Sequence, residues 1–175
     1  MADDKKEKWV TYLSFTTVII AVCATLSTFK GGGYSTKSLL NQSLASDQWN
    51  LYEAKSIKSY IYEMQKDNLE LQLSNASLTA NKDTLQKHMD YYTGKIKKYA
   101  ADKEEIKKKA EGLEATRDEC KSHSERFGLA VIFLQISILL SSISALTKKK
   151  MLWIFSMAIG VVGIVYFING FLVFF

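Results

Sequence analysis

Charged and apolar residues are sharply separated along the chain. Residues 9–29, 127–146 and 151–175 contain none of the 23 basic or 18 acidic side chains. Each stretch is long enough to cross a hydrocarbon core of about 30 Å as a helix that rises about 1.5 Å per residue. The pattern therefore predicts an integral membrane protein with three transmembrane helices.

The intervening residues 30–126 are polar and follow a seven-residue repeat. Apolar side chains and one cysteine recur at this interval and continue into the second apolar stretch: Ile57, Met64, Leu71, Leu78, Leu85, Tyr92, Tyr99, Ile106, Leu113, Cys120, Phe127 and Leu134. A sustained repeat of this length is typical of coiled coils, in which such residues form the contact between helices. We interpret these positions as a packing or oligomerisation seam.

Few residues interrupt helix formation in this part, since Pro is absent from the chain. Gly31, Gly32 and Gly33 suggest a loop, and Ser46 or Asp47 a helix cap before a helix that starts near Trp49. From there the repeat passes Arg126 without Gly or Pro breaking the pattern before the membrane, so one helix is expected to enter the second apolar stretch directly.

Both ends of the polar segment must return to one membrane, which requires a reversal. Residues 74–81 have the most turn-like composition near its middle, so we predict a helical hairpin. Gly94 is a second candidate for the turn. A single continuous helix that bridges two membranes is the competing geometry, because the repeat persists through the proposed turn.

The predicted fold is thus an all-α membrane protein with a long coiled-coil-like helical hairpin inserted between the first and second transmembrane helices. The chain divides into a cytoplasmic N-terminus (1–8), transmembrane helices at 9–29, 127–146 and 151–175, the hairpin (30–126), and a basic loop (147–150).

Small and weakly polar residues recur at helical spacing inside the second and third apolar stretches. The main candidates are Ser137, Ser141, Ser156, Gly160 and Gly163. Such residues let helix backbones approach closely and form hydrogen bonds across the contact, so tight helix packing is the favoured interpretation. The alternative is an oligomeric channel or transporter with a weakly polar pore, lined by Ser137, Ser141 and Ser144; the absence of ionisable residues in the stretches argues against it.

Positive charge is concentrated at one end of the membrane part. Of the net charge of +5, Lys148, Lys149 and Lys150 supply three charges in one short loop. Because basic residues in short loops favour the cytoplasmic side, this loop and the N-terminus are predicted to be cytoplasmic and the hairpin extracytoplasmic. Basic and acidic residues alternate in the hairpin, which argues against a nucleic-acid partner.

Candidate chemistry is sparse. Cys120 and His123 lie one helical turn apart, but a zinc site needs four ligands and only His88 is left to add. No phosphate-binding loop or catalytic triad spacing occurs, so we expect no enzyme, no metal and no cofactor.

The segment around Trp49, Tyr52 and Glu53, the helix around Tyr99 and Glu104, and the turn that contains Lys148 resemble a bacterial membrane family, domain of unknown function four-three-three-seven. The resemblance covers nearly the whole chain. It implies three spans, a helical insert and a bacterial inner membrane, but no activity. Because the seven-residue repeat continues without a break into a membrane span, we expect a non-enzymatic, self-associating protein with a structural, scaffolding or partner-presenting role. Its expected partners are the lipid bilayer, further copies of the chain and an envelope protein.

Overall fold

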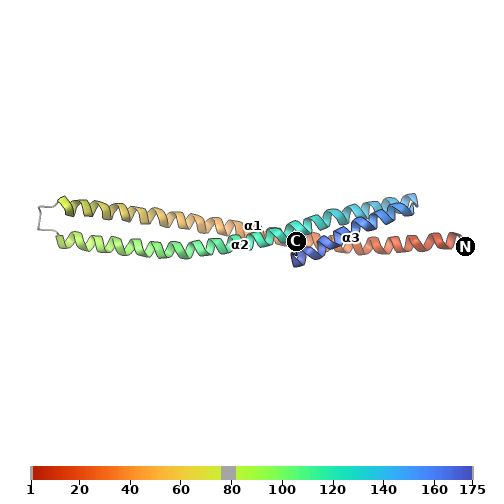
Figure 1. The fold of residues 1–175 in the computed structure, drawn as a ribbon, viewed down its shortest axis with the longest axis horizontal. Coiled ribbons are helices and arrows are strands. Elements are labelled where there is room, and N and C mark those ends of the chain that lie inside the picture. The colour runs from red at the N-terminus through yellow and green to blue at the C-terminus, as the bar shows by residue number, and fades with distance from the viewer. Residues whose placement is uncertain (1, 76–81, 175) are drawn as a thin grey trace. The chain divides into compact units, whose positions relative to one another are not determined.

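The computed structural model describes residues 2–75 and 82–174, and these ranges contain helices only. Helix α1 spans Ala2–Asn75, α2 spans Lys82–Thr147 and α3 spans Lys150–Leu172 (Figure 1). Within the described ranges there is no strand, so the predicted all-α class is confirmed.

Each helix contains a segment that is long and apolar enough to cross a membrane. The three candidate spans lie within Trp9–Ser74, Lys82–Thr147 and Lys150–Leu172. Their apolar segments coincide with the three charge-free stretches of the sequence. The number of span-capable helices in the described part of the chain is therefore the number that the charge pattern predicted.

Helix α1 is longer than predicted, because it continues through both expected interruptions. The predicted loop at Gly31, Gly32 and Gly33 is wrong, as is a helix start capped by Ser46 or Asp47: all five residues lie inside one helix. Each weak helix former costs only about 1 kcal/mol or less in a helix interior, and packing overrides such a cost.

Helix α2 confirms the predicted passage across Arg126 without a break, and Gly94 lies in its interior rather than in a turn. The predicted reversal at 74–81 falls almost entirely on residues 76–81, outside the described ranges. The alternative of a single continuous helix does not match the described residues, since α1 and α2 contact each other side by side, as where Trp49 Nε1 donates to Glu114 Oε1.

The basic loop is shorter than expected, since α2 ends at Thr147 and α3 begins at Lys150. Lys148 has a left-handed backbone with φ of 52°. Lys149 is extended, with φ of −96° and ψ of 104°. Two residues therefore reverse the chain between α2 and α3.

The chain forms two compact units, each built from parts of long helices. The first contains residues 1–40 and 117–175, and the second contains residues 41–116. The core of the first unit combines Ile20 and Ala24 from α1 with Ala130 and Leu134 from α2. Ile164 and Phe167 from α3 pack against this cluster.

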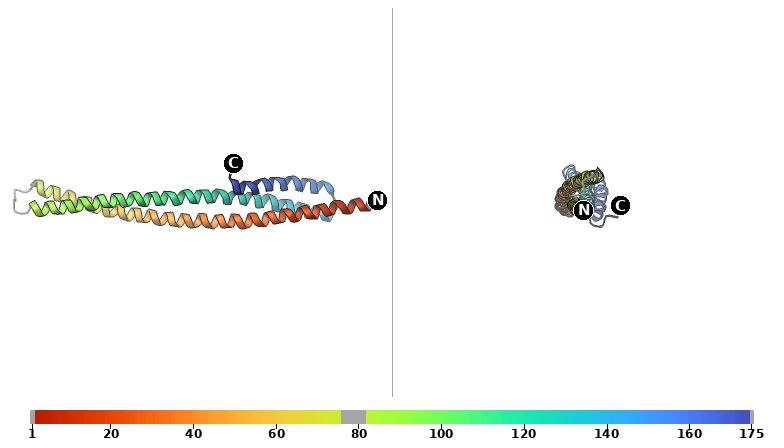
Figure 2. Two further views of the ribbon diagram at one scale, coloured as in Figure 1. Left: turned by 90° about the horizontal axis from the view of Figure 1, so that it is seen from below. Right: turned by 90° about the vertical axis from the view of Figure 1, so that its left-hand side faces the viewer.

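The second unit consists of α1 and α2 alone, which lie side by side in both views (Figures 1 and 2). Trp49 Nε1 donates to Glu114 Oε1 at 2.9 Å, and Lys55 Nζ lies 2.7 Å from Asp102 Oδ2. Farther along α1, the ring of Tyr62 lies 5.7 Å from that of Tyr92. Partner numbers fall as α1 numbers rise, so the two helices are antiparallel in this unit.

Candidate functional site

The predicted serines form a compact hydrogen-bonded contact between α2 and α3 in the first unit. Ser137, Ser141 and Ser156 are all buried. Ser137 Oγ donates to the Ser156 carbonyl oxygen at 2.8 Å, and Ser156 Oγ lies 2.8 Å from the Ser137 carbonyl oxygen. Ser141 Oγ lies 2.7 Å from Ser156 Oγ. One turn farther along α2, Ser144 Oγ donates to the Lys149 carbonyl oxygen at 3.0 Å.

Glycines of α3 permit the close approach that these bonds require. A Cβ at Gly160 would lie 2.8 Å from Ser137 Oγ, and one at Gly163 would lie 2.8 Å from Leu134 Cδ2 and 3.0 Å from its backbone nitrogen. Real Cβ atoms essentially never come within 3.0 Å of such neighbours. The structure thus brings together all five small residues that the sequence singled out in these two stretches, as a packing contact.

The same contact bears on the pore alternative. The hydroxyls of Ser137, Ser141 and Ser144 all have partners inside the chain, on α3 or on the turn that precedes it. A pore-lining hydroxyl would instead have to face water or a passing solute. In this arrangement the serine row holds helices together.

A second contact joins all three helices of the first unit. The ring of Tyr34 on α1 stacks on His123 of α2, with centroids 4.5 Å apart and an interplanar angle of 12°. His123 Nδ1 lies 2.7 Å from the carbonyl oxygen of Gly170 on α3, so this nitrogen carries the proton if the bond is formed. Phe127 packs beside Tyr34 and against Phe171. Phe127 belongs to the seven-residue row, but no pattern in the sequence indicates the stacking of Tyr34 on His123.

Cys120 and His123 make different contacts: His123 stacks on Tyr34, whereas Cys120 is part of the buried row on α2. Cys120 is buried with 3% of its surface exposed, and it is a free thiol. Among the described residues, no three His, Cys, Asp or Glu side chains gather as ligands for a metal ion.

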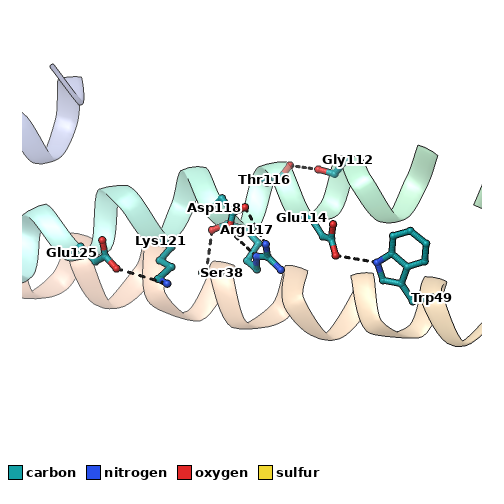
Figure 3. A network of polar contacts seen from close by, with 9 residues as sticks. All are labelled: Ser38, Trp49, Gly112, Glu114, Thr116, Arg117, Asp118, Lys121 and Glu125. Atoms are coloured by element: carbon teal, nitrogen blue, oxygen red, sulfur yellow. Dashed lines mark hydrogen bonds and ion pairs between the residues drawn. The ribbon is translucent and has the colours of Figure 1, made fainter. Parts of the chain in front are cut away.

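The predicted seven-residue row faces inward on α2. Ile106 and Cys120 are buried, and Leu85, Tyr92, Tyr99 and Leu113 are half-buried. Lys103, one of the basic residues between them, places its Nζ 5.9 Å from the centre of the Tyr52 ring. Arg117 is paired with Asp118, and its carbonyl oxygen accepts a bond from Ser38 Oγ at 3.1 Å (Figure 3).

On α1 the predicted row lies on the outer face of the helix. Ile57, Met64 and Leu71 are 56%, 52% and 61% exposed, so they do not form the contact with α2. The inward face carries another seven-residue series, in which Tyr52 and Ser59 are half-buried and buried. Both faces of α1 have the same period, and only the partner helix decides which of them is covered.

The contact between α1 and α2 in the second unit also contains an ion pair. The ammonium group of Lys55 donates a hydrogen bond to Asp102, which lowers the pKa of this carboxyl and raises the pKa of Lys55. Lys55 Nζ also lies 5.2 Å from the centre of the Tyr99 ring. Burial, followed by the neighbouring Tyr91, raises the pKa of Tyr62, which stacks on Tyr99.

The predicted topology determinants lie at the surface. Lys148, Lys149 and Lys150 are exposed around the turn between α2 and α3. Their ammonium groups are therefore free to contact water or lipid headgroups at one end of the first unit.

Comparison with known proteins identifies a family but no activity. No curated protein and no solved structure matches the chain. The family model described as "Domain of unknown function (DUF4337)" matches residues 9–173, which include all three span-capable helices. Because this match covers nearly the whole chain, the protein belongs to that family, as the resemblance of its sequence predicted.

Proposed function

We propose that this protein is a non-enzymatic, self-associating integral membrane protein with a structural, scaffolding or partner-presenting role. Its three apolar helical segments anchor it in the bilayer, and its second unit is a helical hairpin held at the membrane surface. The hairpin is the part that meets other molecules.

Anchoring is supported by the composition and packing of the first unit. Large apolar side chains cover its surface, including Phe15, Val22, Leu139 and Phe155. Between its helices, small residues and hydrogen-bonded serines lie beside buried Ile20, Phe127 and Leu134. This distribution suits a helix bundle in lipid, where close packing and internal hydrogen bonds hold helices together.

One observation carries the proposal of self-association. Two helices alone leave many large apolar side chains of the second unit in contact with solvent: Leu44, Leu51, Ile57, Tyr60, Ile61, Met64, Leu71 and Tyr91. Exposed apolar patches of this kind mark protein interaction surfaces. A hairpin with uncovered apolar residues gains stability when a further helix covers them.

The test is to count subunits of the full-length chain in native membrane patches extracted without detergent. A single fluorescent label on each chain should bleach in two or more steps within one particle. Single-step bleaching in nearly all particles would contradict the proposal. A monomeric membrane protein of known stoichiometry, extracted in the same way, calibrates the labelling efficiency.

A further inference from the structure

The face of α1 that points away from α2 carries an ordered apolar row. Ile57, Ile61, Met64 and Leu71 are each at least half exposed, at 56%, 50%, 52% and 61%. Their intervals alternate between four and three residues before a final step of seven. This is the spacing of the two core positions in a coiled coil, usually named a and d.

The register of this row is continuous over nearly three heptads. Ile57, Met64 and Leu71 occupy d positions, and Ala54, Ile61 and Asn68 occupy a positions. None of the six side chains carries a charge. An asparagine at an a position is typical of coiled coils that fix their register and number of strands at some cost in stability.

The same α1 segment therefore has two seams on opposite sides. Lys55, Ser59 and Tyr62 face α2, and they fall at the b and f positions of the outer register. In a two-stranded coiled coil these positions face solvent. Because α2 already occupies that side, the a and d row remains open for a different helix.

Charges beside the row fit an identical helix in parallel. Glu53 occupies the g position before Ile57, and Lys58 occupies the e position five residues later. In a parallel pair, a g residue faces the e residue of the next heptad on the other strand. Two copies in register would then place Glu53 of each beside Lys58 of the other, and both side chains are exposed.

Membrane anchoring also favours a parallel arrangement of the two α1 helices. Copies inserted in one bilayer with one topology must point their α1 helices the same way, so only a parallel contact is open to them. Confinement in the membrane also raises the effective concentration of the helices, which favours pairing through a seam of fewer than three heptads.

We propose that the face of α1 formed by Ala54, Ile57, Ile61, Met64, Asn68 and Leu71 binds the same face of a second copy as a parallel, in-register coiled coil. This inference rests on the proposed self-association and specifies its surface, its partner and its direction.

The test uses disulfide crosslinking of the full-length chain in membranes, with Cys23→Ala and Cys120→Ala removing both native thiols. Ile57→Cys should crosslink to its own copy within minutes of mild oxidation, since identical residues meet at a d position. Ala101→Cys is the matched control: it is exposed on α2, between the inward-facing Tyr99 and Lys103. It should crosslink at least tenfold less.

Charge reversal gives a second test, in which the added substitutions lie beside the core and not in it. Glu53→Lys should reduce crosslinking at Ile57→Cys several-fold, because Lys would then face Lys58 of the other copy. Adding Lys58→Glu to Glu53→Lys should restore crosslinking to near its starting level.

Four outcomes would overturn the inference. Equal crosslinking of Ile57→Cys and Ala101→Cys would indicate random collision. A disulfide between Ile57→Cys on one chain and Leu71→Cys on another, without self-crosslinking of either, would indicate antiparallel pairing. If Ile57→Cys does not crosslink while the wild-type chain bleaches in several steps, the chain self-associates through another surface. If the wild-type chain bleaches in a single step, both this surface and self-association are refuted.

Discussion

Close packing in the first unit depends on individual glycines, and this dependence can be measured. Gly163→Ala places a methyl group where Leu134 lies, with its nearest carbon atoms at 2.8 Å and its backbone nitrogen at 3.0 Å. Since the backbone cannot yield as a side-chain tip can, we expect a loss of stability of about 1 to 3 kcal/mol. Thermal unfolding in detergent micelles measures it.

Gly128→Ala is the matched control, because it is also a helical glycine of the first unit but has nothing within 4 Å of the added Cβ. It should leave stability unchanged or raise it by up to about 1 kcal/mol, as alanine favours helix. Equal destabilisation by the two substitutions would show that Gly163 is not at a close helix contact.

The ion pair of Lys55 and Asp102 predicts a dependence of stability on pH. The pKa of Asp102 is lowered in the folded chain, so its contribution is present above the unfolded value near 3.8 and is lost as pH falls through the folded value. The pKa of Lys55 is raised above 10.5, so its contribution is lost only as pH rises through the folded value.

Asp102→Asn should therefore weaken the second unit at neutral pH and have little effect once the pH has fallen through the folded pKa of Asp102, where both proteins carry a neutral side chain at this position. Hydrogen exchange of backbone amides in α1 and α2, followed as a function of pH, measures the difference in stability between the two proteins. Glu105→Gln is the control, since its pair with Lys109 joins two exposed side chains of one helix and contributes little. A difference between wild type and Asp102→Asn that does not shrink as the pH is lowered would contradict the prediction.

At the scale of residues, spacing along the sequence is informative where the residues of a contact surface lie on one helix. Ser137 and Ser141, or Gly160 and Gly163, share a face by spacing alone, so their role in packing was predictable. The stacking of Tyr34 on His123 was not, because these residues are far apart in the sequence and neither belongs to a periodic row.

At the scale of helices, the sequence predicted the number of span-capable helices better than the residues at which helices begin and end. Three charge-free stretches identified three span-capable helices, because the length of a span is set by the bilayer. The predicted interruptions inside α1 are wrong, because the weak preference of Gly31 for a loop and of Ser46 for a helix cap is overridden by packing. A Cβ at Gly31 would lie 2.9 Å from Phe127 Cβ, so glycine there serves a close helix contact.

Which face of α1 contacts α2 could not be predicted from the repeat. Its residues form two seven-residue series, one with Tyr52 and Ser59 and one with Ile57 and Met64. Periodicity alone cannot rank two faces that share a period. The face with Ile57 and Met64 has more aliphatic residues, whereas the face that contacts α2 supplies Tyr62 and the Lys55 ion pair.

The contact between α2 and α3 gives a prediction for a pair of helices. Ser156→Ala removes a hydroxyl that lies within hydrogen-bond distance of the Ser137 carbonyl and of Ser141 Oγ. Interhelical hydrogen bonds in membranes are worth roughly 0.6 to 2 kcal/mol, so we expect a loss in this range in the same unfolding measurement.

Ser142→Ala is the corresponding control, because Ser142 is exposed and its hydroxyl bonds only the Ile138 carbonyl of its own helix. Its effect should stay within about 0.5 kcal/mol, the usual range for a surface substitution. If Ser142→Ala is as destabilising as Ser156→Ala, the serine contact does not hold α2 to α3.

At the scale of the whole molecule, the orientation in the membrane determines what the hairpin can meet. Basic residues flank the apolar segments at both ends, with Lys148, Lys149 and Lys150 in a short turn and Lys30 and others in the long insert. The positive-inside rule gives weight to short loops and little to long translocated segments. The turn should therefore be cytoplasmic and the second unit extracytoplasmic.

Labelling with a membrane-impermeant maleimide tests this orientation, but the native Cys120 is buried and unsuitable. In a chain without native thiols, Ala101→Cys should be labelled in intact spheroplasts. Thr147→Cys, next to the basic turn and exposed, should be labelled only after the membrane is permeabilised. The reverse pattern would place the hairpin in the cytoplasm. Since the α1 seam lies on the hairpin, that result would also move its partner copy to the cytoplasmic side without changing the parallel direction of the contact.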